Sequence, residues 1–184
     1  MNGWCVWVTG LPGSGKSVVS QALLKILSER NLHAQILASD NLRKILTPEP
    51  TYSLEERNMV YNTLTYIAKI LTKNGVNVII DATGNLRRYR KNARNQISRF
   101  VEAYLECPLE VCIRRETQRH ETHQAPKHIY SKALQSAAST VPGIGQPYEP
   151  PIAPEITIAS TEDTPQQAAR KIFEMLIKRY NETD

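Results

Sequence analysis

Five short apolar runs, rich in β-branched residues, constrain the fold of this 184-residue chain more than any other feature. They occupy residues 4–8, 34–38, 76–80, 101–105 and 155–159. Because their apolar residues are nearly continuous rather than alternating, these runs are typical of strands covered on both faces, as in parallel sheets. Helical patterns lie between them, and strand–helix alternation favours right-handed crossovers. The sequence therefore predicts a single α/β domain, in which a parallel five-stranded sheet lies between two layers of helices.

Three helices can be placed from their spacing and their end signals. One spans residues 17–29, one spans residues 54–73, and the last runs from Thr164-Pro165 to about residue 180. In the first two, apolar side chains recur every three or four positions, which is the period of an amphipathic helix. Ser53, with Glu56 three residues later, is a capping pair at the start of the second helix. A threonine followed by proline is typical of a helix start.

Composition and charge exclude some classes of protein. No apolar run is long enough to span a bilayer, and the N-terminal residues lack the pattern of a signal peptide, so we expect a cytoplasmic protein with no membrane partner. The three cysteines form no C-x-x-C pair, which indicates neither a disulfide framework nor a zinc site. We expect His120 and His123 in a surface loop rather than on a metal. The net charge of +5 suits a nucleotide, a sulfonucleotide or RNA, but ordinary surface charge explains it equally.

The stretch VTGLPGSGKSVVS, residues 8–20, contains the pattern G-x-x-x-x-G-K-[ST] with every fixed position filled. It follows a predicted strand and opens a predicted helix, which is the context that a phosphate-binding loop requires. Glycines let successive backbone N–H groups turn inward at a helix N-terminus and form a concave anion site. In such loops the lysine reaches the β- and γ-phosphates, and the serine hydroxyl completes the coordination of Mg²⁺. We therefore expect ATP and Mg²⁺ to bind, with the nucleotide held by Gly10, Leu11, Pro12, Gly13, Ser14, Gly15, Lys16, Ser17 and Val18.

The rest of the sequence narrows the class of phosphate binder. The N-K-x-D motif with which GTPases recognise their base is absent. Motor and clamp ATPases usually need a longer chain. A compact chain with its phosphate loop near the N-terminus is typical of a small kinase with the P-loop NTPase fold, which passes the γ-phosphate to an acceptor. The alternative is a nucleotide-binding module that has no transfer activity.

Asp40 is the candidate for the residue that orients the acceptor. It lies in LASDNLRKIL, residues 37–46, after the second apolar run. We expect that run to lie next to the strand of the phosphate loop, and the carboxyl ends of parallel strands are where ligands bind in such sheets. Because phosphoryl transfer has a loose transition state, the carboxylate would align the acceptor hydroxyl more than remove its proton. Capping the following helix is the alternative role.

Asp81 and the arginines that follow it are further candidates. Asp81 ends the third apolar run and is placed to hold Mg²⁺ directly or through water, or else to serve as a turn or cap residue. Arg87, Arg88, Arg90 and Arg94 follow, and they would bind an acidic substrate or form a solvated helical face. Arg87 and Arg90 lie three residues apart and share a face, so they are the better candidates for substrate contacts.

Two later segments are candidates for moving or binding parts. Residues from about 114 to 135 form the predicted lid, where Arg115 or Arg119 would stabilise charge on the transferred phosphoryl group, unless this charge run is only surface. Residues 141–154 contain five prolines and two glycines, which forbids a helix. This second segment is either a connection to the last strand or a substrate-binding loop.

Four segments, in order along the chain, resemble the adenylylsulfate kinase family. Residues 38–43, ASDNLR, keep the second aspartate, the asparagine and the arginine of the family's D-G-D-N-[IV]-R. Residues 53–58, SLEERN, resemble F-S-x-x-D-R, and residues 107–116, CPLEVCIRRE, resemble T-P-L-E-V-C-x-x-R-D. Residues 143–151, GIGQPYEPP, match G-I-D-x-P-Y-E-x-P at most positions. The resemblance therefore covers nearly the whole chain.

The resemblance implies a reaction and completes the set of expected site residues. Family members use ATP to phosphorylate the 3′-hydroxyl of adenosine 5′-phosphosulfate (APS), and the family suggests a homodimer. We expect catalysis to depend on Asp40, Lys16 and Arg115, and Mg²⁺ to be held by Ser17 and Asp81. The acceptor is expected to contact Asp40, Asn41, Arg43, Arg57, Arg87, Arg90 and Ile144.

The departures from the family pattern all lie on the acceptor side. The segment TGNLR, residues 83–87, keeps only the arginine of the family's I-S-P-[FY]-R, and Gly84 stands where some members have a phosphorylated serine. Val141 replaces the aromatic residue that sandwiches the substrate's adenine, Ser139 replaces a lysine and Ala38 replaces the first aspartate. Losing a stacking ring should weaken base binding by roughly 1–3 kcal/mol.

Three functions remain open at this point. The first is an adenylylsulfate kinase dependent on ATP and Mg²⁺. The second is a kinase of the same fold that acts on another hydroxyl, either of a metabolite or of an RNA or nucleotide end. The third is a regulatory nucleotide-binding module. The substitutions at Val141 and Ala38 bear on the choice between the first two, and the intact Lys16, Ser17 and Asp40 argue against the third.

Overall fold

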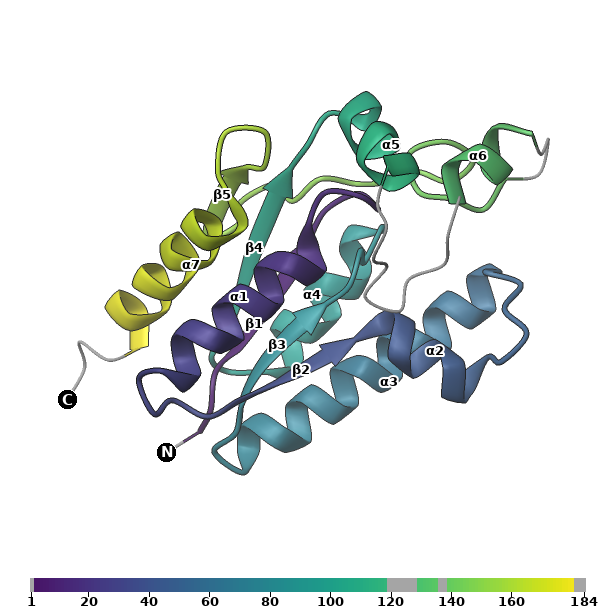
Figure 1. The fold of residues 1–184 in the computed structure, drawn as a ribbon. Coiled ribbons are helices and arrows are strands. Elements are labelled where there is room, and N and C mark those ends of the chain that lie inside the picture. The colour runs from purple at the N-terminus through teal and green to yellow at the C-terminus, as the bar shows by residue number, and fades with distance from the viewer. Residues whose placement is uncertain (1, 119–128, 136–138, 181–184) are drawn as a thin grey trace.

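The computed structural model describes residues 2–118, 129–135 and 139–180. Its centre is a five-stranded sheet in the order β2-β3-β1-β4-β5, and every neighbouring pair of strands is parallel (Figure 1). The sheet therefore confirms the predicted α/β architecture. The strands are β1 (Cys5–Thr9), β2 (Ala34–Ala38), β3 (Asn77–Asp81), β4 (Phe100–Glu106) and β5 (Ile156–Ala159).

Helices cover both faces of the sheet, as the continuous apolar runs require. Side chains of β1 alternate between the two faces, so that Val6 and Val8 pack with α1 and α7, and Cys5 and Trp7 pack with α3 and α4. All five residues of β1 are buried. The described helices are α1 (Lys16–Ser28), α2 (Ser39–Leu46), α3 (Leu54–Lys73), α4 (Arg87–Gln96), α5 (Leu109–Gln118), α6 (Ile129–Leu134) and α7 (Pro165–Tyr180).

The helix starts follow local hydrogen bonding. Ser53 caps α3, because its Oγ accepts from the backbone N–H of Glu56 at 3.2 Å. The Glu56 carboxylate accepts from the N–H groups of residues 51 and 52 instead of from Ser53, so the return bond of the predicted capping pair is made one and two residues earlier. At the start of α7 both bonds of a capping box are present. Gln167 N donates to Thr164 Oγ1 at 3.3 Å, and Thr164 N donates to Gln167 Oε1 at 2.9 Å.

The order of the strands corrects one expectation. The strand that precedes Asp40 is not next to the strand of the phosphate loop, because β3 lies between β2 and β1. In the register of the sheet, Asp81 pairs with Val8 of β1 on one side and with Ala38 of β2 on the other. The carboxyl ends of the three strands are therefore level, and Asp40 follows two strands away from the phosphate loop rather than one.

The carboxyl end of the sheet and the chain termini lie at opposite ends of the molecule. Figure 1 shows α2, α5 and α6 gathered beyond the end to which the strands point, with the N and C ends marked at the other end. Within the described ranges, no helix combines the length and the apolar character that crossing a bilayer requires.

Candidate active site

The phosphate loop packs against α5, which explains one of its glycines. Gly13 has φ +82°, and a Cβ on it would lie 2.5 Å from the carbonyl oxygen of Cys112 in α5. Only glycine meets both the backbone conformation and the close approach. From α6, the Tyr130 hydroxyl donates to the carbonyl of Pro12 at 2.8 Å. The loop is thus held from outside, so that its inner side can face a ligand.

The polar side chains of the loop suit an anionic ligand. Lys16 is buried, and its ammonium donates to the carbonyls of Gly10 at 3.1 Å and Leu11 at 2.9 Å. The buried Ser14 Oγ has no hydrogen-bond partner among the described residues. A buried hydroxyl without a partner costs free energy unless a ligand satisfies it. The loop therefore fits the phosphate chain that its sequence predicts.

Ser17 and Asp81 offer the oxygen donors that Mg²⁺ prefers. Ser17 is the second residue of α1, and Asp81 is the last residue of β3 and is 8% exposed. Among the described residues, no cluster of three or more His, Cys, Asp or Glu side chains could hold a metal ion alone. This pattern fits Mg²⁺, which in phosphotransferases is held by one or two protein oxygens together with substrate phosphates.

Asp40 lies in the first turn of α2, half-buried, on the far side of Asp81 from the phosphate loop. The N-cap of α2 is Ala38, so Asp40 does not cap the helix. Asn41 beside Asp40 is exposed. A cavity of ≈ 110 Å³ opens here, lined by Asp40, Arg43, Lys44, Thr47, Pro48, Pro50 and Tyr52.

Two buried arginines contact Tyr52, which lines this cavity. Arg43 is 7% exposed, with Nη1 3.7 Å from a Glu56 carboxylate oxygen and its guanidinium 4.9 Å from the Tyr52 ring. Arg57 is 5% exposed and donates from Nε to the Tyr52 carbonyl at 3.1 Å and from Nη2 to the Thr140 carbonyl. Burial lowers the pKa of Arg57. Two largely desolvated positive charges so close together favour an anionic partner.

Tyr52 is a site residue that the sequence reasoning did not single out. It has φ +55°, which is unusual for a residue with a side chain, and the conformation is held by its bonds to Glu56 and Arg57. Backbone strain of this kind concentrates at functional sites. The available signal was its place immediately before Ser53, where the family pattern has an aromatic residue.

Arg90, which the sequence predicts to contact the acceptor, is engaged inside the protein. Arg90 is 1% exposed, forms an ion pair with Glu102 of β4 and donates to the carbonyls of Gly84 and Glu149. All its guanidinium nitrogens are therefore engaged inside the protein. Arg87 is exposed at the start of α4, with Nε donating to the Pro150 carbonyl at 2.7 Å, so it lies at the edge of the Pro- and Gly-rich loop.

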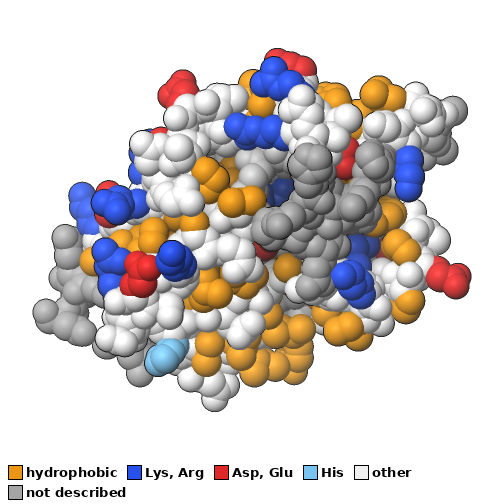
Figure 2. All heavy atoms as spheres, viewed as in Figure 1, with side chains coloured by type: hydrophobic (Ala, Val, Ile, Leu, Met, Phe, Trp, Pro, Cys, Tyr) orange, Lys and Arg blue, Asp and Glu red, His pale blue; other side chains and the backbone are white. Residues whose placement is uncertain are grey.

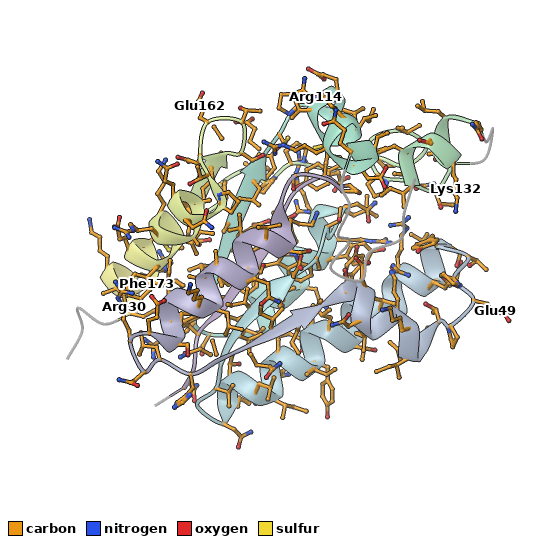
Figure 3. All side chains as sticks on the ribbon, viewed as in Figure 1. Arg30, Glu49, Arg114, Lys132, Glu162 and Phe173 are labelled. Carbon is orange, nitrogen blue, oxygen red and sulfur yellow. The ribbon has the colours of Figure 1, made fainter. Side chains whose placement is uncertain are left out.

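Arg115, which the sequence predicts to stabilise the transferred phosphoryl group, contacts the residue that follows β5. Its guanidinium donates to Ser160 Oγ at 2.8 Å and to the Ser160 carbonyl at 2.7 Å, which links α5 to the end of β5. Arg114 points outward from α5, and Lys132 projects from α6 (Figure 3). Arg119, His120, His123 and the rest of residues 119–128 of the predicted lid lie outside the described part of the chain.

The Pro- and Gly-rich loop, residues 141–154, contacts the phosphate loop. Val141 and Ile144 pack with Leu11 against a buried cluster formed by Cys107, Cys112 and Tyr130. Val141 therefore has a packing role where the family pattern places a stacking ring. Ile144 is half-buried and packs against the same cluster as Leu11 of the phosphate loop.

Trp7 explains why Gly84 stands where some family members carry a serine. Gly84 has φ +50°, and a Cβ on it would lie 2.8 Å from Cζ2 of the Trp7 indole. The indole is fixed, because its Nε1 donates to the Ala82 carbonyl at 2.9 Å. The space that a side chain at position 84 would need is filled by Trp7.

Charge on the visible face does not gather into one basic stripe. Figure 2 shows Lys and Arg side chains dispersed over the described surface, with Asp and Glu among them. A single-stranded nucleic acid is usually tracked by a continuous positive groove. On this face the described residues do not provide one.

The phosphate loop lies between a central parallel strand and a helix, and an acid ends the adjacent strand. A cavity opens at the same edge of the sheet. Together these features define an ATP-dependent kinase of the P-loop class. The family model described as adenylylsulphate kinase matches residues 2–159. The chain therefore belongs to the adenylylsulphate kinase family.

Relatives match over almost the whole chain. A probable adenylyl-sulfate kinase of Pyrococcus abyssi is 36% identical over 173 residues, which are 94% of this chain and 94% of the relative. An adenylyl-sulfate kinase of Clostridium acetobutylicum is 36% identical over 175 residues, covering 95% and 83% of the two chains. A solved Mycobacterium tuberculosis APS kinase in complex with AMPPNP and APS has a TM-score of 0.84 and 30% identity, covering 95% and 98%.

Proposed function

We propose that this chain transfers the γ-phosphate of ATP to the 3′-hydroxyl of APS, giving 3′-phosphoadenylyl sulfate and ADP. One observation carries the proposal. In a chain of this family, the ends of β1, β3 and β2 are level and bring the phosphate loop, Asp81 and Asp40 to one edge of the sheet. ATP on the phosphate loop and an acceptor at Asp40 would then lie on either side of Asp81.

The donor side would hold the triphosphate through backbone amides of residues 10–18 and through Lys16. The Lys16 ammonium is held at the loop by the carbonyls of residues 10 and 11, where its charge would attract a phosphate oxygen. Ser17 and Asp81 would hold Mg²⁺, which neutralises phosphate charge when bound. Ser14 Oγ is a further donor to a phosphate oxygen.

Asp40 would orient the acceptor hydroxyl toward the γ-phosphorus. The oxygen of the acceptor forms the new P–O bond as the bond to ADP breaks, and its proton passes to the Asp40 carboxylate or to water. Because the transition state is loose, alignment contributes more than proton removal. Asp40 therefore acts as a catalytic residue mainly by position.

The anionic phosphosulfate group of APS fits the buried arginines. Arg43 and Arg57 together supply two charges, and Asn41 and Arg87 lie nearer the solvent. Ile144 would contact the substrate from residues 141–154, which act as the substrate loop. We also propose that residues 1–184 form a single kinase domain with its lid at about 114–135, that it works in the cytoplasm and that it forms homodimers.

The test supplies the protein with Mg²⁺, ATP labelled at the γ-position and a panel of acceptors: APS, serine, sugars and a 5′-hydroxyl RNA. Label on APS alone is the expected result. Label only on RNA or a metabolite would contradict the proposal and establish the other acceptor class, and the absence of any transfer would leave only nucleotide binding.

A matched pair of arginine variants tests the acceptor side. Arg57→Lys keeps the charge but loses the two-armed contact with residues 52 and 140, so KM for APS should rise about tenfold or more while KM for ATP stays unchanged. Arg30→Lys is the control, because Arg30 lies beside Phe173 at the other end of the molecule (Figure 3). An equal rise in both KM values would contradict the assignment of Arg57 to the acceptor.

A further inference from the structure

The Tyr148 hydroxyl contacts Thr9, whose own hydroxyl links the end of β1 to the segment that follows β3. The Tyr148 hydroxyl lies 3.0 Å from Thr9 Oγ1, and Thr9 Oγ1 donates to the carbonyl of Thr83 at 2.7 Å. Thr9 immediately precedes Gly10, and Thr83 comes two residues after Asp81. A threonine hydroxyl has one hydrogen, and here it is given to Thr83. The Tyr148 hydroxyl must therefore be the donor to Thr9.

The Tyr148 ring is fixed from two sides. The Tyr104 ring stacks on it with a centroid separation of 6.2 Å and an interplanar angle of 23°. The guanidinium carbon of the buried Arg90 lies 5.8 Å from its centroid. Burial also raises the pKa of Tyr148 well above its ordinary value, so its hydroxyl stays protonated and remains a donor.

Hydrogen bonds join the substrate loop around Tyr148 to the segment that follows β3. Five of them, from 2.6 to 3.0 Å, connect residues 147–150 with residues 85–90. The bonds are Asn85 Nδ2 to Pro147 O, Glu149 N to Asn85 O, Arg87 N to Glu149 Oε2, Arg87 Nε to Pro150 O and Arg90 Nη2 to Glu149 O.

The substrate loop also touches the tip of the phosphate loop. A Cβ on Gly143 would lie 3.0 Å from Leu11 Cδ2, so the backbone there rests on the Leu11 side chain. The substrate loop thus contacts the phosphate loop at its tip, through Leu11, and at its base, through Thr9. Of these two contacts, the bond from Tyr148 to Thr9 is polar and directional. It shares Thr9 Oγ1 with the bond to the Thr83 carbonyl, which lies two residues after β3.

We propose that Tyr148 is a positioning residue for phosphoryl transfer. Its bond to Thr9 sets how the end of β1, from which the phosphate loop starts, lies against the substrate loop, and the substrate loop is in turn bonded to residues 85–90 after β3. The catalytic consequence rests on the proposed kinase function. Transfer requires close alignment, and a misplacement of about 1 Å can lower a rate by about a hundredfold.

The test compares Tyr148→Phe with Tyr104→Phe. The first variant keeps the stacked ring and loses only the hydroxyl. Tyr104 is the matched control, because it belongs to the same ring pair and its hydroxyl has no partner in the described part of the chain. Two readouts are measured on the full chain: amide hydrogen exchange of residues 83–86 and 143–149 without substrate, and kcat and KM for ATP and APS.

For Tyr148→Phe we expect exchange in both segments to become about tenfold faster. We also expect kcat to fall about tenfold with KM for ATP unchanged. Tyr104→Phe should resemble the wild type in both readouts. Unchanged exchange in residues 83–86, or an equal loss of kcat in the two variants, would overturn the inference. If the wild type transfers no phosphate to APS, the proposed function fails, and the exchange readout still decides the role of Tyr148.

Discussion

Gly84→Ala tests whether Trp7 excludes a side chain from the β3–α4 loop. The methyl group would lie 2.8 Å from Cζ2 and 3.1 Å from Cε2 of the indole, and φ at this residue is +50°. An L-residue in the left-handed region costs about 1–2 kcal/mol, and overpacking a buried site costs about 1–3 kcal/mol. Together these predict that the free energy of unfolding falls by about 2–5 kcal/mol. For a chain of this length the melting temperature should fall by roughly 10 °C.

Urea denaturation followed by circular dichroism measures this loss, and a second background separates its two parts. Trp7→Phe shortens the ring and removes the contact, so in that background Gly84→Ala should cost only the backbone part, about 1–2 kcal/mol. The coupling between positions 7 and 84 is then the difference between the two costs. The reasoning is refuted if Gly84→Ala costs the same free energy in both backgrounds, or if it leaves the stability of the wild type unchanged.

Three further predictions concern Asp40, the thiol of Cys112 and the ion pair of Glu155 with Arg94. Asp40→Ala should lower kcat by about a hundredfold or more and leave ATP affinity unchanged; equal losses, measured by kinetics and nucleotide titration, would make Asp40 structural. Burial raises the pKa of the Cys112 thiol to about 12, so iodoacetamide at pH 8 should label Cys112 only after unfolding, and rapid labelling of the native protein would contradict this burial. Burial alone would raise the pKa of Glu155, but bonds from Arg94 and from the Glu102 N–H hold it below the ordinary 4.5. Glu155 should therefore stabilise the fold above pH 4.5 and lose that contribution as the pH falls through its lowered pKa, so the stability gap between the wild type and Glu155→Gln should shrink in acid. A gap that stays constant from pH 7 to pH 3 would refute this assignment.

The donor side could be predicted because its determinants are local. The residues of the phosphate loop are consecutive, and the strand before it and the helix after it follow from apolar periodicity over residues 4–29. The bounds predicted for α3 agree with the structure, since its capping serine immediately precedes the twenty residues that carry the apolar spacing. The order of the strands could not be read in this way, because whether β3 inserts between β1 and β2 depends on contacts between distant segments.

Arg90 illustrates why the acceptor side was harder to predict. An arginine near the start of a helix has the same local sequence whether it binds a substrate or a buried carboxylate. Its partner Glu102 lies on β4, and Glu149 lies in the loop of residues 141–154, so the pairing exists only once the strands are ordered. Arg115 is similar, because Ser160 reaches it from the end of β5. Both arginines were identified as functional from charge and position, and the structure assigns their charges to tertiary contacts.

The same distinction accounts for where this chain departs from its family. The phosphate loop is constrained by backbone geometry: Gly13 has φ +82° and no room for a side chain beside Cys112. The acceptor side is held by contacts between segments far apart in sequence, such as Arg57 with Thr140. Such contacts can be kept with different side chains if the neighbours change together. Trp7 and Gly84 are one such pair: the large indole on β1 requires the glycine, and a smaller residue at position 7 would leave room for a serine. Departures concentrated on the acceptor side are therefore compatible with an intact site, provided that each replaced contact has a compensating neighbour.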